Sequence, residues 1–435
     1  MSAASYFNTI SWVVFGALSA VNLAVLAAYR TEWGARHLVP GARAALRWIS
    51  RRRDLDWLDW EPVLAAGLIA FAGVSAYGLL SGAYGCHPPG VSDPVGLLSS
   101  GRAFLRGQNP FTVPDCGGRI QVPYGLVAVL LDALGSLGGL AGIYVVWGLV
   151  AFSVVPLVWA LGGADRREVL LYVGTSVLLV PLISSQIDGA TNALVPAVLL
   201  LSVYLARRSE LLSAVAAGFL STARFPNLFP LLGSTGAYRR RRVVAFLVAG
   251  LTFGAVTLLT YLVYREEFLG PVFLSQVGRR SFSLNLYGPL LFANALPSSL
   301  AVEGLQAGLT LALVLVVFLR VRSPLLGIAI VVTGFSLLTP FLSYNILIWL
   351  LPVALVAARA RWWLWGIATV GSFNYDVALN VWAWDDGITW PSAVLDLVLT
   401  GLLLALFVEL WRQARSDPGP AVAGTGSTPA PARGG

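Results

Sequence analysis

A polar segment at residues 86–121 separates two long apolar runs of the chain and reads CHPPGVSDPVGLLSSGRAFLRGQNPFTVPDCGGRIQ. It contains Asp93, the arginines Arg102, Arg106 and Arg119, and both cysteines. The runs on either side are long and apolar enough to cross a lipid bilayer as helices. The position of this segment relative to the membrane therefore decides how the rest of the chain is arranged.

The composition is typical of a membrane protein. Hydrophobic residues make up 57% of the 435 residues and charged residues only 11%, whereas soluble domains carry roughly 25% charged residues. In lipid the backbone must satisfy its own hydrogen bonds, and apolar runs of about 20 residues do so as helices. We therefore expect an all-α polytopic membrane protein.

The net charge of +8 comes from arginines in short clusters between apolar runs, because the chain has no lysine. Such clusters are typical of the cytoplasmic loops of membrane proteins and do not indicate a nucleic-acid partner. The two histidines and two cysteines are too few for a convincing metal cage. The sequence thus predicts membrane lipids as surroundings, and no metal or cofactor.

The positive-inside rule orients the chain when every arginine cluster is placed in the cytoplasm. Residues 86–121 then lie outside, the N-terminus lies outside and the C-terminus inside, with about 12–13 transmembrane helices. The apolar runs that we expect to span are 7–29, 62–84, 141–161, 169–184, 193–206, 243–264, 304–319, 324–338, 345–358, 362–375 and 391–411.

Three parts of the chain follow from this topology. Residues 1–84 form a transmembrane hairpin with a basic cytoplasmic loop, and residues 85–411 form the main membrane domain. Residues 412–435 are rich in proline, glycine and alanine, which predicts a disordered cytoplasmic tail.

Two stretches are apolar but do not fit as full crossings. If residues 122–137 crossed the membrane, every later arginine cluster would lie outside the cell, against the positive-inside rule. We therefore expect a helix that lies at or dips into the outer surface. Residues 211–223 and 226–238 are each too short to span comfortably. We interpret them as two broken helices that meet near Arg224.

This topology places the unusual polar clusters on one face of the membrane. They are residues 93–121, 185–192, 224–227, 265–287, 340–345 and 374–390. Polar backbone at membrane depth is tolerated where it lines a cavity or is buried in protein. The clusters either line one outward-facing cavity or are ordinary loops; the cavity is favoured because Asp188 and Arg224 lie so close to apolar runs.

Asp93 opens an amphipathic stretch in which Leu97, Leu98, Ala103 and Leu105 form an apolar stripe, with Arg102 and Arg106 on the other side. This pattern predicts an interfacial helix in the first large external loop. Gly107, followed by Asn109-Pro110, predicts its end. Asp93 is then either a helix cap or a carboxylate held at headgroup depth for chemistry.

Several short motifs follow one another along the chain. Asp93 is followed by RAFLRGQNPF at residues 102–111, then by Pro123-Tyr124 and an apolar helix. The later motifs are SQIDGATN at 185–192, AGFL at 217–220, ARFP at 223–226 and LTPFLSYN at 338–345. In this order they resemble the GT-C superfamily of polyprenol-phosphate-sugar-dependent glycosyltransferases, most closely glycosyltransferase family 87, which is typified by α-mannosyltransferases.

The resemblance implies a GT-C-like bundle and an inverting hexosyltransferase. One carboxylate, Asp93, is enough to deprotonate an acceptor hydroxyl because polyprenyl phosphate is an adequate leaving group. Arg224 is the first candidate to bind the phosphate, followed by Arg279, Arg280 and Arg102.

Five further residues are candidates for substrate binding, some of which could equally have only a packing role. Gln186, Asp188 and Asn192 either line the sugar site or have a packing role. Tyr344 and Asn345 stand near the positions of a histidine pair that the family carries and this chain lacks. The usual Y-P-P of the family is also replaced by V-P-Y-G at residues 122–125.

The cysteines Cys86 and Cys116 share the external segment, so they either form a disulfide or remain a free pair.

The expected partners are a polyprenyl-phosphate sugar donor and a glycolipid, glycan or glycoprotein acceptor. Mannose is the family default, and arabinofuranose or another sugar remains open. The expected location is the plasma membrane, with the active site on the extracytoplasmic side. The alternatives are a lipid-linked sugar flippase or other transporter, which predicts inverted repeats, and a polytopic component without catalytic activity.

Overall fold

The computed structural model describes residues 93–113, 125–161, 186–238, 241–272, 285–287, 290, 299–339, 344–358, 364, 366–367, 370–371 and 390–417. Within these residues the regular structure is helical and no strand occurs. Three described helices are long and apolar enough to cross a membrane, at Gly139–Val158, Arg242–Tyr264 and Ala393–Ser416. The expected all-α class is therefore confirmed for the part of the chain that the structure describes.

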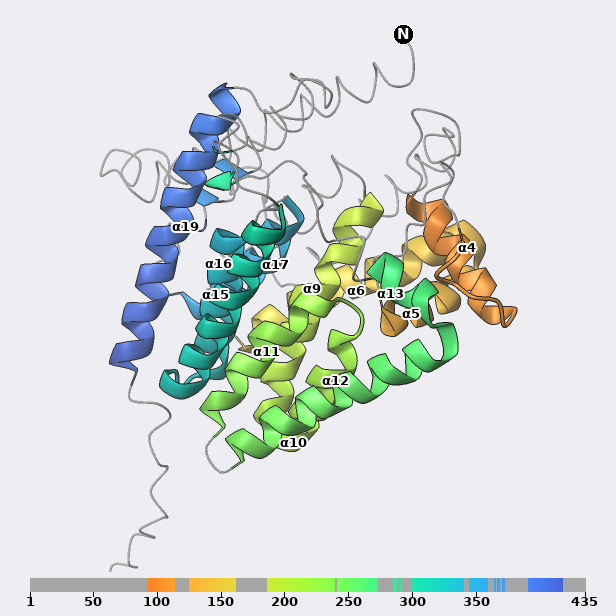
Figure 1. Ribbon diagram of the computed structural model, residues 1–435, viewed down its shortest axis with the longest axis horizontal. Coiled ribbons are helices and arrows are strands. Elements are labelled where there is room, and N and C mark those ends of the chain that lie inside the picture. The colour runs from red at the N-terminus through yellow and green to blue at the C-terminus, as the bar shows by residue number, and fades with distance from the viewer. Residues whose placement is uncertain are drawn as a thin grey trace, which may run out of the picture.

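The helices follow one another across the molecule in Figure 1. On one flank, α4 (Asp93–Leu105) and α5 (Leu126–Ser136) pack against α6 (Gly139–Leu161), which packs on α9 (Gln186–Ala206). On the other side of α9 lie α16 (Pro324–Leu338) and α17 (Tyr344–Ala357). Next to α16 stand α15 (Ser299–Arg320) and α19 (Trp390–Ser416), and α19 closes the opposite flank.

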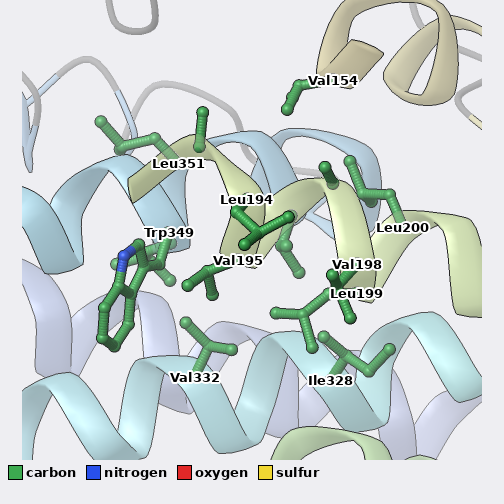
Figure 2. Packing of buried hydrophobic residues seen from close by; sticks show 14 of the residues in the cluster. Val154, Leu194, Val195, Val198, Leu199, Leu200, Ile328, Val332, Trp349 and Leu351 are labelled. Atoms are coloured by element: carbon green, nitrogen blue, oxygen red, sulfur yellow. The ribbon is translucent and has the colours of Figure 1, made fainter. Parts of the chain in front are cut away.

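The buried core lies around α9. Its side chains Leu194, Val198 and Leu199 pack between those of α16 and α17, as Figure 2 shows. Val332 of α16 faces the earlier part of α9 and Ile328 the later part, so these two helices run antiparallel. Since α17 returns from α16, α9 and α17 run parallel and begin at the same end of the core.

The predicted helix break near Arg224 is confirmed. Helix α10 (Glu210–Ser221) ends, a single 3₁₀ turn η4 (Phe225–Asn227) follows, and α11 (Leu228–Ser234) then begins, continued by the 3₁₀ turn η5 (Thr235–Ala237). The Thr222 hydroxyl donates back to the Phe219 carbonyl at 2.6 Å, and Pro226 has no N–H to continue the helix. These local causes interrupt the helix between two apolar halves.

Helix α9 differs from the expected span. We expected the polar residues 185–192 outside a span that begins at Ala193, but α9 begins at Gln186. Gln186, Asp188 and Asn192 therefore lie within the first turns of a helix rather than in a loop. The apolar count misses this start because these turns are polar, while their backbone still forms helical hydrogen bonds.

Helix α4 confirms the predicted helix from Asp93 and its predicted end. Gly107 takes φ +67°, and the amides of Gln108 and Gly107 donate to the carbonyls of Ala103 and Phe104 at 2.9 and 3.0 Å. This is the Schellman arrangement that ends helices at a left-handed glycine. Within the predicted apolar stripe, Leu97 and Ala103 are buried, whereas Leu105 is 51% exposed.

Helix α5 is too short to cross a bilayer. Its 11 residues rise about 16 Å against a hydrocarbon core of about 30 Å. Its length agrees with the expectation that residues 122–137 do not span. α5 is followed by α6 and packs closely on α4, where a Cβ on Gly101 would meet the Asp132 carbonyl at 2.3 Å.

The remaining described helices agree closely with the expected runs. Helix α12 is Arg242–Tyr264 and is followed by the short α13 (Glu266–Val272). Helix α16 matches its expected run, and α19 continues past Trp411 to Ser416. The expected spans at 7–29, 62–84 and 169–184, most of 362–375, and the cysteines Cys86 and Cys116 lie outside the described residues.

Gly125 should tolerate no larger residue. Its amide donates to the Ala223 carbonyl at 3.0 Å, and a Cβ there would lie 1.6 Å from the Thr222 carbonyl oxygen. We expect Gly125→Ala to lower the free energy of unfolding by about 3 kcal/mol, because backbone must move. Thermal unfolding of the purified protein in detergent measures this. The control is Gly254→Ala in α12, where a Cβ meets nothing within 4 Å; equal melting temperatures for both variants would contradict the close contact.

Candidate functional site

A cationic side chain is fixed between three helical elements at the break after α10. The Arg224 Nη1 donates to Asn192 Oδ1 of α9 at 2.5 Å. The same oxygen accepts from Trp349 Nε1 of α17 at 3.2 Å. The Arg224 guanidinium carbon also lies 5.5 Å from the centroid of the Trp349 ring. We call Asn192, Arg224 and Trp349 the arginine cluster.

The fold brings these residues together through the parallel packing of α9 and α17. Asn192 and Trp349 each lie in the second turn of their helix, so they stand at the same end of the core. Arg224 reaches them because its extended backbone, φ −143° and ψ 116°, leads from α10 into η4. The break in the helix therefore supplies the cation, and two intact helices supply its partners.

The surroundings make the cluster electrostatically strong. Asn192 is completely buried and Trp349 is 7% exposed, while Arg224 is half-buried. A guanidinium over an indole face gains roughly 0.5–2 kcal/mol, and the gain rises as the pair is desolvated. The Trp349 ring is held in turn by Phe335 of α16, with the ring centroids 6.5 Å apart and the planes 23° apart. A positive charge is thus presented in one fixed orientation.

The structure places the other predicted site residues as follows. Asp93 is the first residue of α4, Gln186 and Asp188 lie in the first turn of α9, and Tyr344 and Asn345 open α17. The positions of their side chains lie outside the described part of the structure. Arg279 and Arg280 are also outside the described residues, and Arg102 is exposed on α4. Of the predicted set, the structure therefore shows direct contact between Asn192 and Arg224.

The loop after α4 is clasped to the corner between α12 and α13. Asn109 Nδ2 donates to Glu267 Oε2, and Asn109 Oδ1 accepts from the Phe111 amide at 2.9 Å. Phe111 is fully buried, with edge-to-face contacts to the rings of Tyr264 and Phe268 at 5.3 and 5.1 Å. This clasp explains the Asn-Pro-Phe part of the motif: it holds the end of the helix that begins with Asp93.

The corner itself is conformationally unusual. Arg265 takes φ 53° and ψ −135°, a region that residues with a side chain rarely adopt. The clasp formed by Asn109 and Phe111 lies directly against this corner. The loop after α4 and the turn after α12 therefore hold each other in place.

A buried asparagine closes the end of α16. Asn285 Nδ2 donates to the carbonyls of Thr339 and Ser336 at 2.7 and 3.0 Å, and its Oδ1 accepts from the Tyr287 amide at 3.0 Å. Burial raises the pKa of the half-buried Tyr287, so this phenol stays neutral at physiological pH. Asn285 thus fixes the end of the helix that carries Phe335.

A second buried polar pair anchors α5 to α6. Trp147 Nε1 donates to Asp132 Oδ1 at 2.8 Å, and both residues are completely buried. Because Gly101 of α4 packs on the Asp132 carbonyl, this pair lies under α4. It fixes the surface on which α4 rests.

Sequence reasoning missed Trp349, Phe335, Asn285 and Asp132. Trp349 and Phe335 sit inside apolar runs and resemble ordinary core residues, so no local signal separates them from their neighbours. Asp132 was the clearest available signal, because a carboxylate inside an apolar run is costly unless it has a partner. Within the described residues, no group of three His, Cys, Asp or Glu side chains is placed to hold a metal ion.

Comparisons with known proteins give no family. No protein-family model matches the chain, and neither a curated protein nor a solved structure matches it significantly.

The clasp can be tested by exchanging its two polar groups. Asn109→Asp places a carboxylate against Glu267, and we expect it to lower the free energy of unfolding by about 1 kcal/mol because like charges repel. The double variant Asn109→Asp/Glu267→Gln restores an amide–carboxylate pair of the same total length, so it should recover most of this loss. Melting temperatures of the single and double variants measure the effect. A double variant no more stable than Asn109→Asp would contradict the clasp.

Proposed function

We propose that the chain is a membrane glycosyltransferase that moves a sugar from a polyprenyl-phosphate donor to an extracytoplasmic glycolipid or glycan. Asp93 is the general base, and Arg224 binds the phosphate of the donor. The reaction is an inverting hexosyl transfer, with mannose as the first sugar to test. The domain is a GT-C-like bundle of about 12–13 transmembrane helices with α4 as its interfacial helix.

The observation that carries the proposal is the fixed guanidinium of Arg224. A charge inside an apolar bundle is costly, and it is retained where it serves a ligand or an ion pathway. Arginine binds phosphate through a planar fork of N–H groups. Asn192 and Trp349 hold this fork before any ligand arrives, which is the preorganisation that makes an electrostatic catalyst effective.

The proposed step balances with one base and one cation. The acceptor hydroxyl oxygen attacks the anomeric carbon, and its proton passes to the Asp93 carboxylate. The bond from the anomeric carbon to the phosphate oxygen breaks, and its electron pair stays on the departing polyprenyl phosphate. The phosphate gains negative charge as it leaves, so Arg224 binds the transition state more strongly than the bound donor.

The membrane setting fits a lipid-borne donor. Three described helices are long and apolar enough to span, and α12 and α15 carry many exposed apolar side chains, among them Leu251, Leu262 and Leu315. Such faces suit contact with lipid chains. We place the protein in the plasma membrane, with Asp93 and Arg224 toward the extracytoplasmic side by the positive-inside rule.

The transfer reaction is tested with Asp93→Asn and Arg224→Ala. Membranes that contain each variant receive radiolabelled polyprenyl-phosphate sugars, and transfer to lipid or glycan is counted. We expect Asp93→Asn to lose about 100-fold or more in rate because the base is removed. Arg224→Ala should lose about 100–1,000-fold because a preorganised cation is removed, and Arg224→Lys should restore little because it lacks the fork.

The matched control is Arg208→Ala. Arg208 lies just beyond the other end of α9, over the Tyr204 ring at 5.4 Å, so it makes a cation–π contact of similar geometry. It should leave transfer unchanged. Full transfer by Asp93→Asn would reject the proposed base. Movement of the intact donor across the membrane without transfer would favour the flippase.

The proposed sidedness is tested by labelling position 93. Asp93→Cys is made in a chain whose Cys86 and Cys116 are replaced by serine, and an impermeant thiol reagent is added to intact cells. We expect labelling from the outside, with Arg208→Cys in the same background labelled only after permeabilisation. The reverse pattern would reject the topology.

A further inference from the structure

Asn227 is a completely buried asparagine whose side chain has no hydrogen-bond partner within the described part of the chain. Neither its Oδ1 nor its Nδ2 is paired, and its exposed fraction is 0%. The carboxamide can donate two hydrogen bonds and accept two. Enclosing such a group unpaired costs stability, so a native structure retains it for a reason.

The other fully buried asparagines show that this is unusual for the protein. Asn192 accepts from Arg224 and Trp349. Asn285 donates to the end of α16 and accepts from Tyr287. Where the fold uses a buried carboxamide as a structural link, it therefore satisfies that group. Asn227 does not serve as such a link.

The backbone places Asn227 beside the arginine cluster. Its amide donates to the Arg224 carbonyl at 3.0 Å, which closes the single 3₁₀ turn η4. Arg224 stands directly before this turn and Asn227 is its last residue, so the two side chains start one turn apart. The ring of Phe225 contacts Phe229 of α11 and Phe253 of α12. The turn η4 also packs against α9, the helix that carries Asn192, so Asn227 lies within one turn of the arginine cluster.

We propose that Asn227 binds the neutral, hydroxyl-bearing part of the ligand whose phosphate Arg224 binds. This proposal rests on the proposed function and specifies its sugar site. A carboxamide offers a donor and an acceptor side by side, which matches two neighbouring hydroxyls of a sugar. It suits a phosphate poorly, because Oδ1 would then face a negative charge. The broken helix thus presents a cation and a neutral amide, one turn apart, to the two halves of a glycosyl phosphate.

The assignment predicts an unusual combination of effects on stability. Asn227→Leu keeps the side-chain size and removes two unpaired polar groups, so the melting temperature of the purified protein without ligand should rise by about 2 °C or more. Asn285→Leu is the matched control and should lower the melting temperature, because it removes bonded groups. A fall for Asn227→Leu like that of Asn285→Leu would overturn the proposal.

Ligand binding supplies the decisive measurement. Dissociation constants are measured for polyprenyl phosphate and for the same lipid carrying mannose or arabinofuranose. We expect the preferred sugar to tighten binding to the unmodified protein about 10-fold through paired hydrogen bonds. In Asn227→Leu the ratio of the two dissociation constants, without and with the sugar, should fall toward one. The affinity for polyprenyl phosphate itself should stay unchanged. Arg224→Ala should weaken both ligands and keep the ratio.

The outcomes separate this inference from the transfer reaction. If Asn227→Leu keeps the sugar-dependent ratio, or weakens polyprenyl phosphate as Arg224→Ala does, the inference fails even when transfer is observed. If no sugar is transferred but the ratio depends on Asn227, the sugar site stands and the transferase proposal fails. Asn227→Ala is scored in the same way if Asn227→Leu does not yield folded protein.

Discussion

The hydrogen bond from Arg224 to Asn192 is the constraint around which the described site is arranged. A guanidinium among apolar helices is tolerated only with partners, and here one amide oxygen and one indole ring supply them. Asn192 accepts from both Arg224 and Trp349 because α9 and α17 pack side by side with Asn192 and Trp349 at the same end of the core. The apolar contacts along α9 set this arrangement, since Val332 and Ile328 of α16 fit against it and α17 returns from α16. The core therefore determines the orientation of the charge.

Close backbone contacts extend this arrangement to α4. Gly125 rests on the carbonyl of Thr222, next to the break that carries Arg224, and is the N-cap residue of α5. α5 in turn supports α4 through Gly101 and the Asp132–Trp147 pair. In Figure 1 the first turns of α4 and α9 lie on the same side of the molecule. The contacts at Gly125 and Gly101 are close contacts with backbone. A shift of the break near Arg224 would therefore also move α5 and α4, the helix that begins with Asp93.

The sequence predicted the elements whose signals are local. The break near Arg224, the glycine that ends α4 and the bounds of α16 all follow from proline, glycine and apolar run length. The start of α9 was wrong because its first turns are polar. Trp349 and Asn285 could not be predicted as site residues, because their roles depend on partners far away in the chain. Asp93 was predicted from a motif, and the structure places it at the start of a helix without describing its side chain.

The helix break is more than an interruption between two apolar halves. An unbroken helix would satisfy its own backbone hydrogen bonds, but it would lack the extended backbone through which Arg224 reaches Asn192 and Trp349. The 3₁₀ turn instead separates Arg224 and Asn227 by a single turn, while Phe225 between them contacts Phe253 of α12. One residue is fixed by Asn192 and Trp349, and the other is buried without a partner among the described residues. A ligand with adjacent charged and neutral polar groups would satisfy both, which is the chemistry of a sugar joined to a phosphate.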